Sequence, residues 1–197
     1  MPIISACILL FLVMDPFGNI PFFLSVLKTV PREKRKRVIA RELLIALIIL
    51  TVFLFLGPYF LKVLRISESS LRMAGGLVLF LIALKMIFGG TQELFKGTPE
   101  GEPLIVPLAV PAIAGPSTVA TILLLVGQEP SRWPEWLLSV GLAWLSTAVI
   151  LLSSTELARL FGERGLTAIE RLMGLILTAI SVEMFLQGIR TFLRSAV

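Results

Sequence analysis

The chain has 197 residues, of which 56% are hydrophobic and 16% charged, whereas a soluble domain usually carries roughly a quarter charged residues. It has no histidine and a single cysteine, Cys7, so it lacks the commonest acid–base residue and cannot form an intramolecular disulfide. These features argue against a soluble enzyme, and the clustering of basic residues in one short segment argues against a nucleic-acid-binding protein.

Apolar runs of membrane-spanning length follow one another along the chain. A spanning helix needs about 20 mostly apolar residues, and six segments meet this requirement. In chain order, the predicted spans cover residues 2–27, 43–61, 71–90, 103–128, 136–155 and 172–188. The first run lacks the basic leader of a cleaved signal peptide, so we expect it to be a retained span. Because the connections are short, we predict one all-α integral membrane domain over residues 1–197.

Basic residues outside the spans predict the orientation of the chain. The loop after the first span is rich in Lys and Arg between Lys28 and Arg41, and the loops after spans three and five add more on the same side. Lys and Arg in short loops mark the cytoplasmic side of a membrane. We therefore predict a multi-pass protein of the cytoplasmic membrane with both termini outside. Its basic loop is expected to contact anionic lipid headgroups.

The chain reads as two halves of three spans each. Repeat 1 covers about residues 1–90, a short loop covers about 91–102, and repeat 2 covers about 103–197. The third span of each half opens alike, with RMAG at residues 72–75 and RLMG at residues 171–174. Three spans per half is an odd number, so the second half enters the membrane from the opposite face. This is the inverted topology that is common among secondary transporters.

The first span of each half, spans one and four, is interrupted by proline and glycine. The interruptions read DPFGNIP at residues 15–21 and PAIAGPST at residues 111–118. Proline removes a backbone donor and clashes with the preceding turn, so we predict that both helices are broken at mid-membrane. The freed backbone groups must then face protein or a water-filled cavity, where half-helix ends bind charge. The alternative is that these prolines only kink their helices.

Three charged residues lie inside the predicted spans, where a charge is costly. Asp15 has three candidate roles: a cap for the half-helix after Pro16, a partner for a substrate ammonium, or a proton acceptor. Lys85 and Glu183 lie at corresponding positions late in the third span of each half. Two alternatives stay open for them: they pair or serve in ion coupling, or they extend toward opposite membrane surfaces.

These motifs resemble those of the MarC family of integral membrane proteins, which includes the SnatA transporters of small neutral amino acids. The resemblance is carried by DPFGNIPFF at residues 15–23 and VPLAVPAIAGP at residues 106–116, together with residues 72–76 and 171–174. It covers essentially the whole chain. It implies six spans and the transport of a small neutral amino acid such as alanine or glycine.

The resemblance also implies where the substrate binds. The implied substrate-binding residues are Asp15, Pro16, Gly18, Asn19, Pro21, Gly115, Pro116, Ser117 and Thr118. We expect alternating access coupled to Na⁺ or H⁺, with Asp15, Lys85 and Glu183 as candidates for ion coupling. We expect no enzymatic activity, no metal, no other cofactor and no nucleic-acid partner, and a homo-oligomer is left open. The alternatives are an exporter of drugs or other metabolites, a channel, and a non-transporting membrane scaffold.

Overall fold

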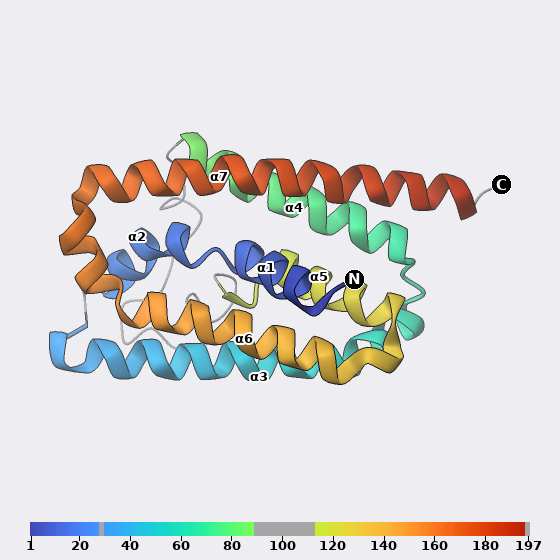
Figure 1. The fold of residues 1–197 in the computed structure, drawn as a ribbon, viewed down its shortest axis with the longest axis horizontal. Coiled ribbons are helices and arrows are strands. Elements are labelled where there is room, and N and C mark those ends of the chain that lie inside the picture. Colours follow the sequence, from blue (N-terminus) through green and yellow to red (C-terminus); the bar gives the residue numbers. More distant parts are fainter. Residues whose placement is uncertain (28–29, 89–112, 196–197) are drawn as a thin grey trace.

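All of the regular structure described in the computed structural model is helical (Figure 1). The structure describes residues 1–27, 30–88 and 113–195. The helices are α1 (Ile3–Met14), α2 (Pro16–Val26), α3 (Arg32–Leu64), α4 (Glu68–Phe88), α5 (Pro116–Gln128), the 3-10 helix η4 (Pro130–Arg132), α6 (Trp133–Leu152) and α7 (Ser154–Ser195).

Five helical segments of the described chain are long and apolar enough to cross a membrane. They correspond to predicted spans one, two, three, five and six, and the first of them consists of α1 and α2 in succession. Helix α5 has 13 residues and is apolar, but it is shorter than a full span. It is the second half of predicted span four, whose first half, with the loop at about 91–102, lies outside the described residues.

Large apolar side chains cover the outside of the bundle as well as its interior. Leu44, Leu81, Leu145 and Leu175 are each more than half exposed, while Trp136 is buried in the interior. In water this surface would be unfavourable over so many helices, whereas hydrocarbon solvates it. The architecture is therefore that of an integral membrane protein, as the composition predicts.

Two segments that the sequence suggested were loops are helical. Helix α3 begins at Arg32, so most of the basic cluster forms its first turns, and Lys36 there pairs with Glu156 at 3.5 Å. Helix α7 begins at Ser154, within predicted span five, and changes direction at Gly162, where φ is +65°. Lys, Arg and Glu are strong helix formers, so the charges that keep these segments out of hydrocarbon do not stop the helix.

Helices α4 and α7 pack with their backbones in close contact. A side-chain carbon added at Gly76 would lie 2.9 Å from both the Phe185 nitrogen and the Ser181 oxygen. One added at Gly174 would lie 3.0 Å from the Ala83 oxygen, and Gly188 is equally close to the Ser69 oxygen on α4. These contacts set an antiparallel register for the two helices, because small residues let helix backbones approach within membranes.

The two halves of the chain run in opposite senses along the bundle. In Figure 1 the continuous path of α1 and α2 runs opposite to α5, α3 runs opposite to α6, and α4 runs opposite to α7. This order is compatible with an inverted repeat. The repeat itself stays a prediction, because the first part of its second half lies outside the described residues.

Candidate functional site

The first helix break is confined to one residue, Asp15. Its backbone is left-handed (φ 43°, ψ 64°), a conformation that Asp and Asn tolerate better than most residues. Helix α2 then starts at Pro16 and continues through Pro21. The prediction of a break is confirmed, but the unwound segment is shorter than DPFGNIP suggested. Pro is well placed at a first helical position, and this explains why the helix resumes at once.

The backbone groups at the first break are bonded within the protein. The Gly18 N–H donates to the Asp15 carboxylate at 3.1 Å, and the Asn19 N–H donates to the Asp15 carbonyl at 3.1 Å. The Asn19 side-chain amide donates to the Met14 carbonyl at 2.9 Å. Of the three roles left open for Asp15, the structure shows the cap. In this conformation the backbone N–H groups of Gly18 and Asn19 are both bonded within the protein.

Glycine at position 18 is required by this capping arrangement. A side-chain carbon there would collide with the Asp15 carboxylate and with the end of the Met86 side chain on α4. Asp15 is itself 5% exposed. The first break is thus a packed unit in which the carboxylate, the glycine and the amide side chain fit one another.

The start of α5, where the sequence predicts the second break, has a different chemistry. Residues 103–112 of that predicted span lie outside the described residues. Gly115 precedes α5 in an extended conformation (φ −73°, ψ 167°) and has no side chain with which to cap the helix. Pro116 is the first helical residue, and Ser117 and Thr118 behind it are 4% and 1% exposed. The first N–H groups of a helix have no partner within it. The start of α5 is therefore a buried helix N-terminus with a positive partial charge.

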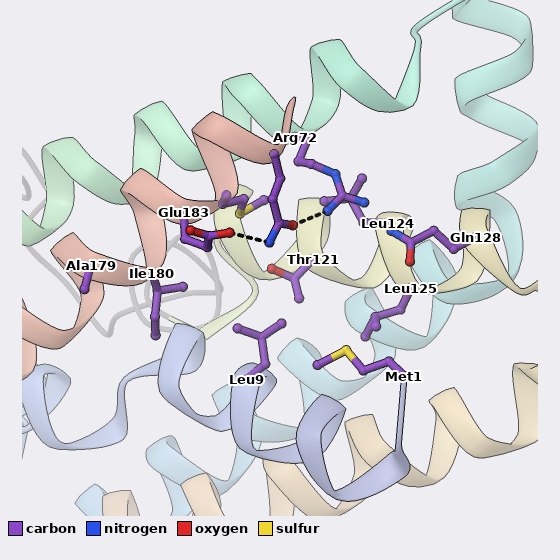
Figure 2. Close-up of a pocket in the computed structure, with 12 residues that line it drawn as sticks. Met1, Leu9, Arg72, Thr121, Leu124, Leu125, Gln128, Ala179, Ile180 and Glu183 are labelled. Carbon is purple, nitrogen blue, oxygen red and sulfur yellow. Dashed lines mark hydrogen bonds between the residues drawn. The ribbon is translucent and has the colours of Figure 1, made fainter. Parts of the chain in front are cut away.

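A cavity of about 530 Å³ lies between α1, α4, α5 and α7 (Figure 2). Its apolar wall includes Leu9 of α1, Leu124 of α5 and Ile180 of α7. The buried Thr121 of α5 also lines it, and its hydroxyl donates to the Ser117 carbonyl at 2.9 Å. Thr121 thus lies about 7.5 Å along the axis from the start of α5 at Pro116. The cavity approaches the second break.

A chain of polar side chains crosses this cavity. The Arg72 guanidinium of α4 donates to the Gln187 side-chain oxygen at 2.7 Å, and the Gln187 amide donates to the Glu183 carboxylate at 2.8 Å. Figure 2 shows both bonds as dashed lines. Of these three residues, the sequence pattern pointed to Glu183 as a candidate, whereas Arg72 was only part of the repeat and Gln187 had no predicted role. The signal for Gln187 was its position one helical turn after Glu183.

Lys85 and Glu183 do not pair with one another. Glu183 accepts its hydrogen bond from Gln187, whereas Lys85 is exposed in the last turn of α4 and has no ion pair with any described carboxylate. The antiparallel register explains the separation. Gly174 lies opposite Met86, beside Lys85, and Phe185 lies opposite Gly76, so the two charges are about two turns apart along the pair.

The predicted site residues thus fall into three places. Asp15, Pro16, Gly18, Asn19 and Pro21 belong to the packed first break, and none of them lines the cavity. Gly115, Pro116, Ser117 and Thr118 form the start of α5, where Pro116 is exposed and the other three are buried. None of the four lines the cavity, which is reached by Thr121 further along α5. Glu183 lines the cavity itself. Among the described residues, no three His, Cys, Asp or Glu side chains gather as a metal site would require.

Comparison with known proteins covers nearly the whole chain. The model of the MarC family of integral membrane proteins matches residues 1–193. The chain is 48% identical over 193 residues to the UPF0056 inner membrane protein YhgN of Escherichia coli strain K12, covering 98% of each chain. It is 35% identical over 188 residues to a UPF0056 membrane protein of Chlamydia pneumoniae, covering 95% of this chain and 93% of the relative. No solved structure matches the chain.

Proposed function

The chain belongs to the MarC family of integral membrane proteins, and from that premise we propose that it is a secondary transporter of a small neutral amino acid. The proposed mechanism is alternating access, driven by Na⁺ or H⁺. The Escherichia coli relative is named as an inner membrane protein, and this supports a location in the cytoplasmic membrane. The orientation with both termini outside, which the basic residues favour, belongs to the same proposal.

The buried N-terminus of α5 next to a cavity is the observation that carries this proposal. The amides of Ser117 and Thr118 lie at a helix start that has no side-chain cap, and such ends attract carboxylates. Secondary transporters commonly bind anionic substrate groups at the ends of interrupted helices. The carboxylate of an amino acid is the group that fits this position, and we expect the proline backbone at Pro116 to favour a small side chain there.

The first break supplies the second part of the proposed site. One Asp15 oxygen accepts the Gly18 N–H. Asp15 is the only acidic residue between Ile3 and Val26, the segment that contains α1 and α2. It would neutralise the ammonium of the substrate or take up the coupling ion after α1 and α2 shift toward α5. Coupling through Asp15 costs no new buried charge, because the incoming cation compensates the carboxylate that is already in the membrane.

An exporter of larger apolar compounds is the second candidate, and the cavity is what favours it. Its wall is mainly apolar, and its volume of about 530 Å³ lies within the range of drug-binding pockets. The charged side chains that cross it favour a charged or zwitterionic ligand instead. For this reason amino acid transport remains the leading proposal.

Reconstitution of the purified protein into liposomes tests the proposed class. Uptake of labelled alanine and glycine is measured with an imposed Na⁺ or proton gradient and compared with protein-free liposomes. A thermal-shift screen against the twenty amino acids, with and without Na⁺, accompanies it. Gradient-dependent uptake and a selective shift with alanine or glycine support the proposal. Unitary currents in bilayers would indicate a channel. Inhibition of uptake by drugs but not by amino acids would indicate an exporter. The absence of a response to any ligand would indicate a scaffold.

The assignment of the α5 site is tested by conservative variants of its hydroxyl residues. Thr118→Val keeps the shape of a buried side chain at the helix start but removes its polar atom. Thr178→Val is the matched control, because the Thr178 hydroxyl bonds to the Gly174 carbonyl within α7. We expect Thr118→Val to raise the KM for alanine and the control to leave it unchanged. Equal KM values in both variants would remove the Thr118 hydroxyl from the site.

A further inference from the structure

The cavity is lined by one cationic side chain, Arg72, and one anionic side chain, Glu183, which form no ion pair with each other. Arg72 and Glu183 are both bonded to Gln187, one to each end of its amide. We propose that this cavity is a separate recognition site for the zwitterionic backbone of an α-amino acid, with Arg72 binding the carboxylate and Glu183 the ammonium. This inference rests on the proposed function, because it takes the transported class as its ligand.

The hydrogen-bond polarity of the Gln187 amide matches that of a zwitterion. Its oxygen accepts from the Arg72 guanidinium at 2.7 Å and its nitrogen donates to the Glu183 carboxylate at 2.8 Å. A bound amino acid would present a carboxylate to the first partner and an ammonium to the second, with both bonds charge-assisted at the two ends. The present bonds to Gln187 have one charged partner each, whereas bonds to a zwitterion would join opposite charges at both ends. The ligand therefore has a physical reason to displace the Gln187 side chain.

The cost of the Glu183 charge supports a ligand-binding role. A carboxylate within a spanning helix is costly, so such residues usually face a water-filled cavity or a partner of opposite charge. Glu183 lies within the segment Arg164–Arg194, which is long enough to span, and it lines the cavity. In the described part of the chain its hydrogen-bond partner is a neutral amide. A cationic group of a ligand would compensate that charge.

The remaining wall defines the rest of the ligand. Leu9, Leu125, Ile180 and Met184 surround the polar chain, and they offer an apolar surface to an amino acid side chain. The cavity is larger than glycine or alanine needs, so this site selects for the zwitterion rather than for a small side chain. Thr121, on the cavity wall, belongs to the same helix as the proposed α5 site. A substrate bound at Arg72 and Glu183 would therefore lie close to that proposed site.

The test uses leucine as a probe, because it is a zwitterion with a side chain too large for the proposed α5 site. Binding of leucine, N-acetylleucine and leucinamide to the full chain is measured by thermal shift in detergent. The two derivatives remove the ammonium and the carboxylate charges in turn. We expect leucine to stabilise the protein, each derivative to bind at least about tenfold more weakly, and leucine to inhibit alanine uptake without being transported.

Charge-removing variants then assign the two ends of the site. In Arg72→Gln and Glu183→Gln, leucine affinity is expected to fall about tenfold or more. Lys85→Gln on α4 and Arg190→Gln on α7 are matched controls, because both residues are exposed and outside the cavity. If a variant gives little folded protein, the comparison of leucine with its two derivatives on the unaltered protein still decides the proposal.

The outcomes separate this inference from the proposed function. Alanine uptake with no leucine binding, or with equal binding of leucine and its derivatives, overturns the cavity site and leaves the transporter proposal standing. Leucine binding that is lost in Glu183→Gln, together with no uptake of any neutral amino acid, supports the site and removes the transport function. Equal leucine affinity in all four variants overturns the assignment of Arg72 and Glu183.

Discussion

The side-chain amide of Asn19 donates a 2.9 Å hydrogen bond to the main-chain carbonyl of Met14, across the break between α1 and α2. A break leaves carbonyls without helical partners, and in hydrocarbon each of them costs several kcal/mol if it stays unsatisfied. Asn19 and Asp15 therefore bond backbone groups at the interruption with side chains of the chain itself.

We expect Asn19→Ala to lower the stability of the fold and to reduce alanine uptake. The substitution leaves the Met14 carbonyl without the Asn19 donor, and an unsatisfied buried group costs about 1–3 kcal/mol. Ser146→Ala is the control, because the Ser146 hydroxyl is exposed and bonds within its own helix. Equilibrium unfolding in mixed SDS micelles measures the free energy of unfolding of both variants. A stability for Asn19→Ala equal to that of the control would contradict the bridging role.

Replacement of Asp15 by Asn and by Ala separates its cap from its charge. Asn can accept the Gly18 N–H and tolerates the left-handed backbone, whereas Ala does neither well. We expect Asp15→Ala to lose about 1–2 kcal/mol of unfolding free energy and Asp15→Asn to lose much less. If the carboxylate also couples the ion, alanine uptake by folded Asp15→Asn becomes independent of the gradient. Full gradient-driven uptake in that variant would exclude Asp15 from coupling.

The close contact of α4 with α7 makes Gly76 intolerant of a methyl group. In Gly76→Ala the added carbon would lie 2.9 Å from backbone atoms of Phe185 and Ser181, and overpacking of this kind typically costs about 1–3 kcal/mol. At Gly141, within α6, nothing lies within 4 Å of an added carbon. Gly141→Ala is thus the control and should be neutral or slightly stabilising. Thermal unfolding in one detergent compares them, and equal midpoints would refute the packing argument.

The connection from α5 to α6 should weaken in acid. A hydrogen bond from Arg132 holds the pKa of the Glu129 carboxyl below its ordinary value of 4.5. Because the folded pKa is the lower one, the unfolded chain takes up protons first as the pH falls, and the stabilisation present above 4.5 is lost below it. The difference in the midpoint of thermal unfolding between the wild type and Glu129→Gln should be small at pH 7 and should vanish toward pH 3.5.

A control checks that the acid effect belongs to this carboxylate. Glu33 is exposed near the start of α3 and has no hydrogen bond within the described residues, so Glu33→Gln should show no such pH-dependent difference. A Glu129→Gln difference that grows as the pH falls would have the wrong sign for the hydrogen bond with Arg132. It would contradict the assignment.

The helices and the breaks were within reach of the sequence because their causes are local. Length and apolarity set the spans, and the Asp-Pro pair sets the interruption at Asp15. Local signals also misled in places. The charges between Glu156 and Arg171 suggested a loop, although Arg and Glu favour helix, and the Gly-Asn pair suggested a longer unwound segment than Asp15 alone.

The cavity could not be read from the sequence because it depends on helix register. Arg72 and Gln187 meet only after Gly76, Gly174 and Gly188 bring α4 and α7 into one antiparallel alignment. The same register separates Lys85 from Glu183, which sequence position alone left undecided. Asp15 shows the reverse case, since its three possible roles are chemically equal until the distance to Gly18 is known.

The glycine contacts between α4 and α7 also restrict how this molecule can change shape. Backbones in direct contact resist sliding and separation, since either would open empty space that lipid tails fill poorly. Under the proposed alternating access, α4 and α7 would therefore stay together as one unit, and the other helices would have to move relative to this pair.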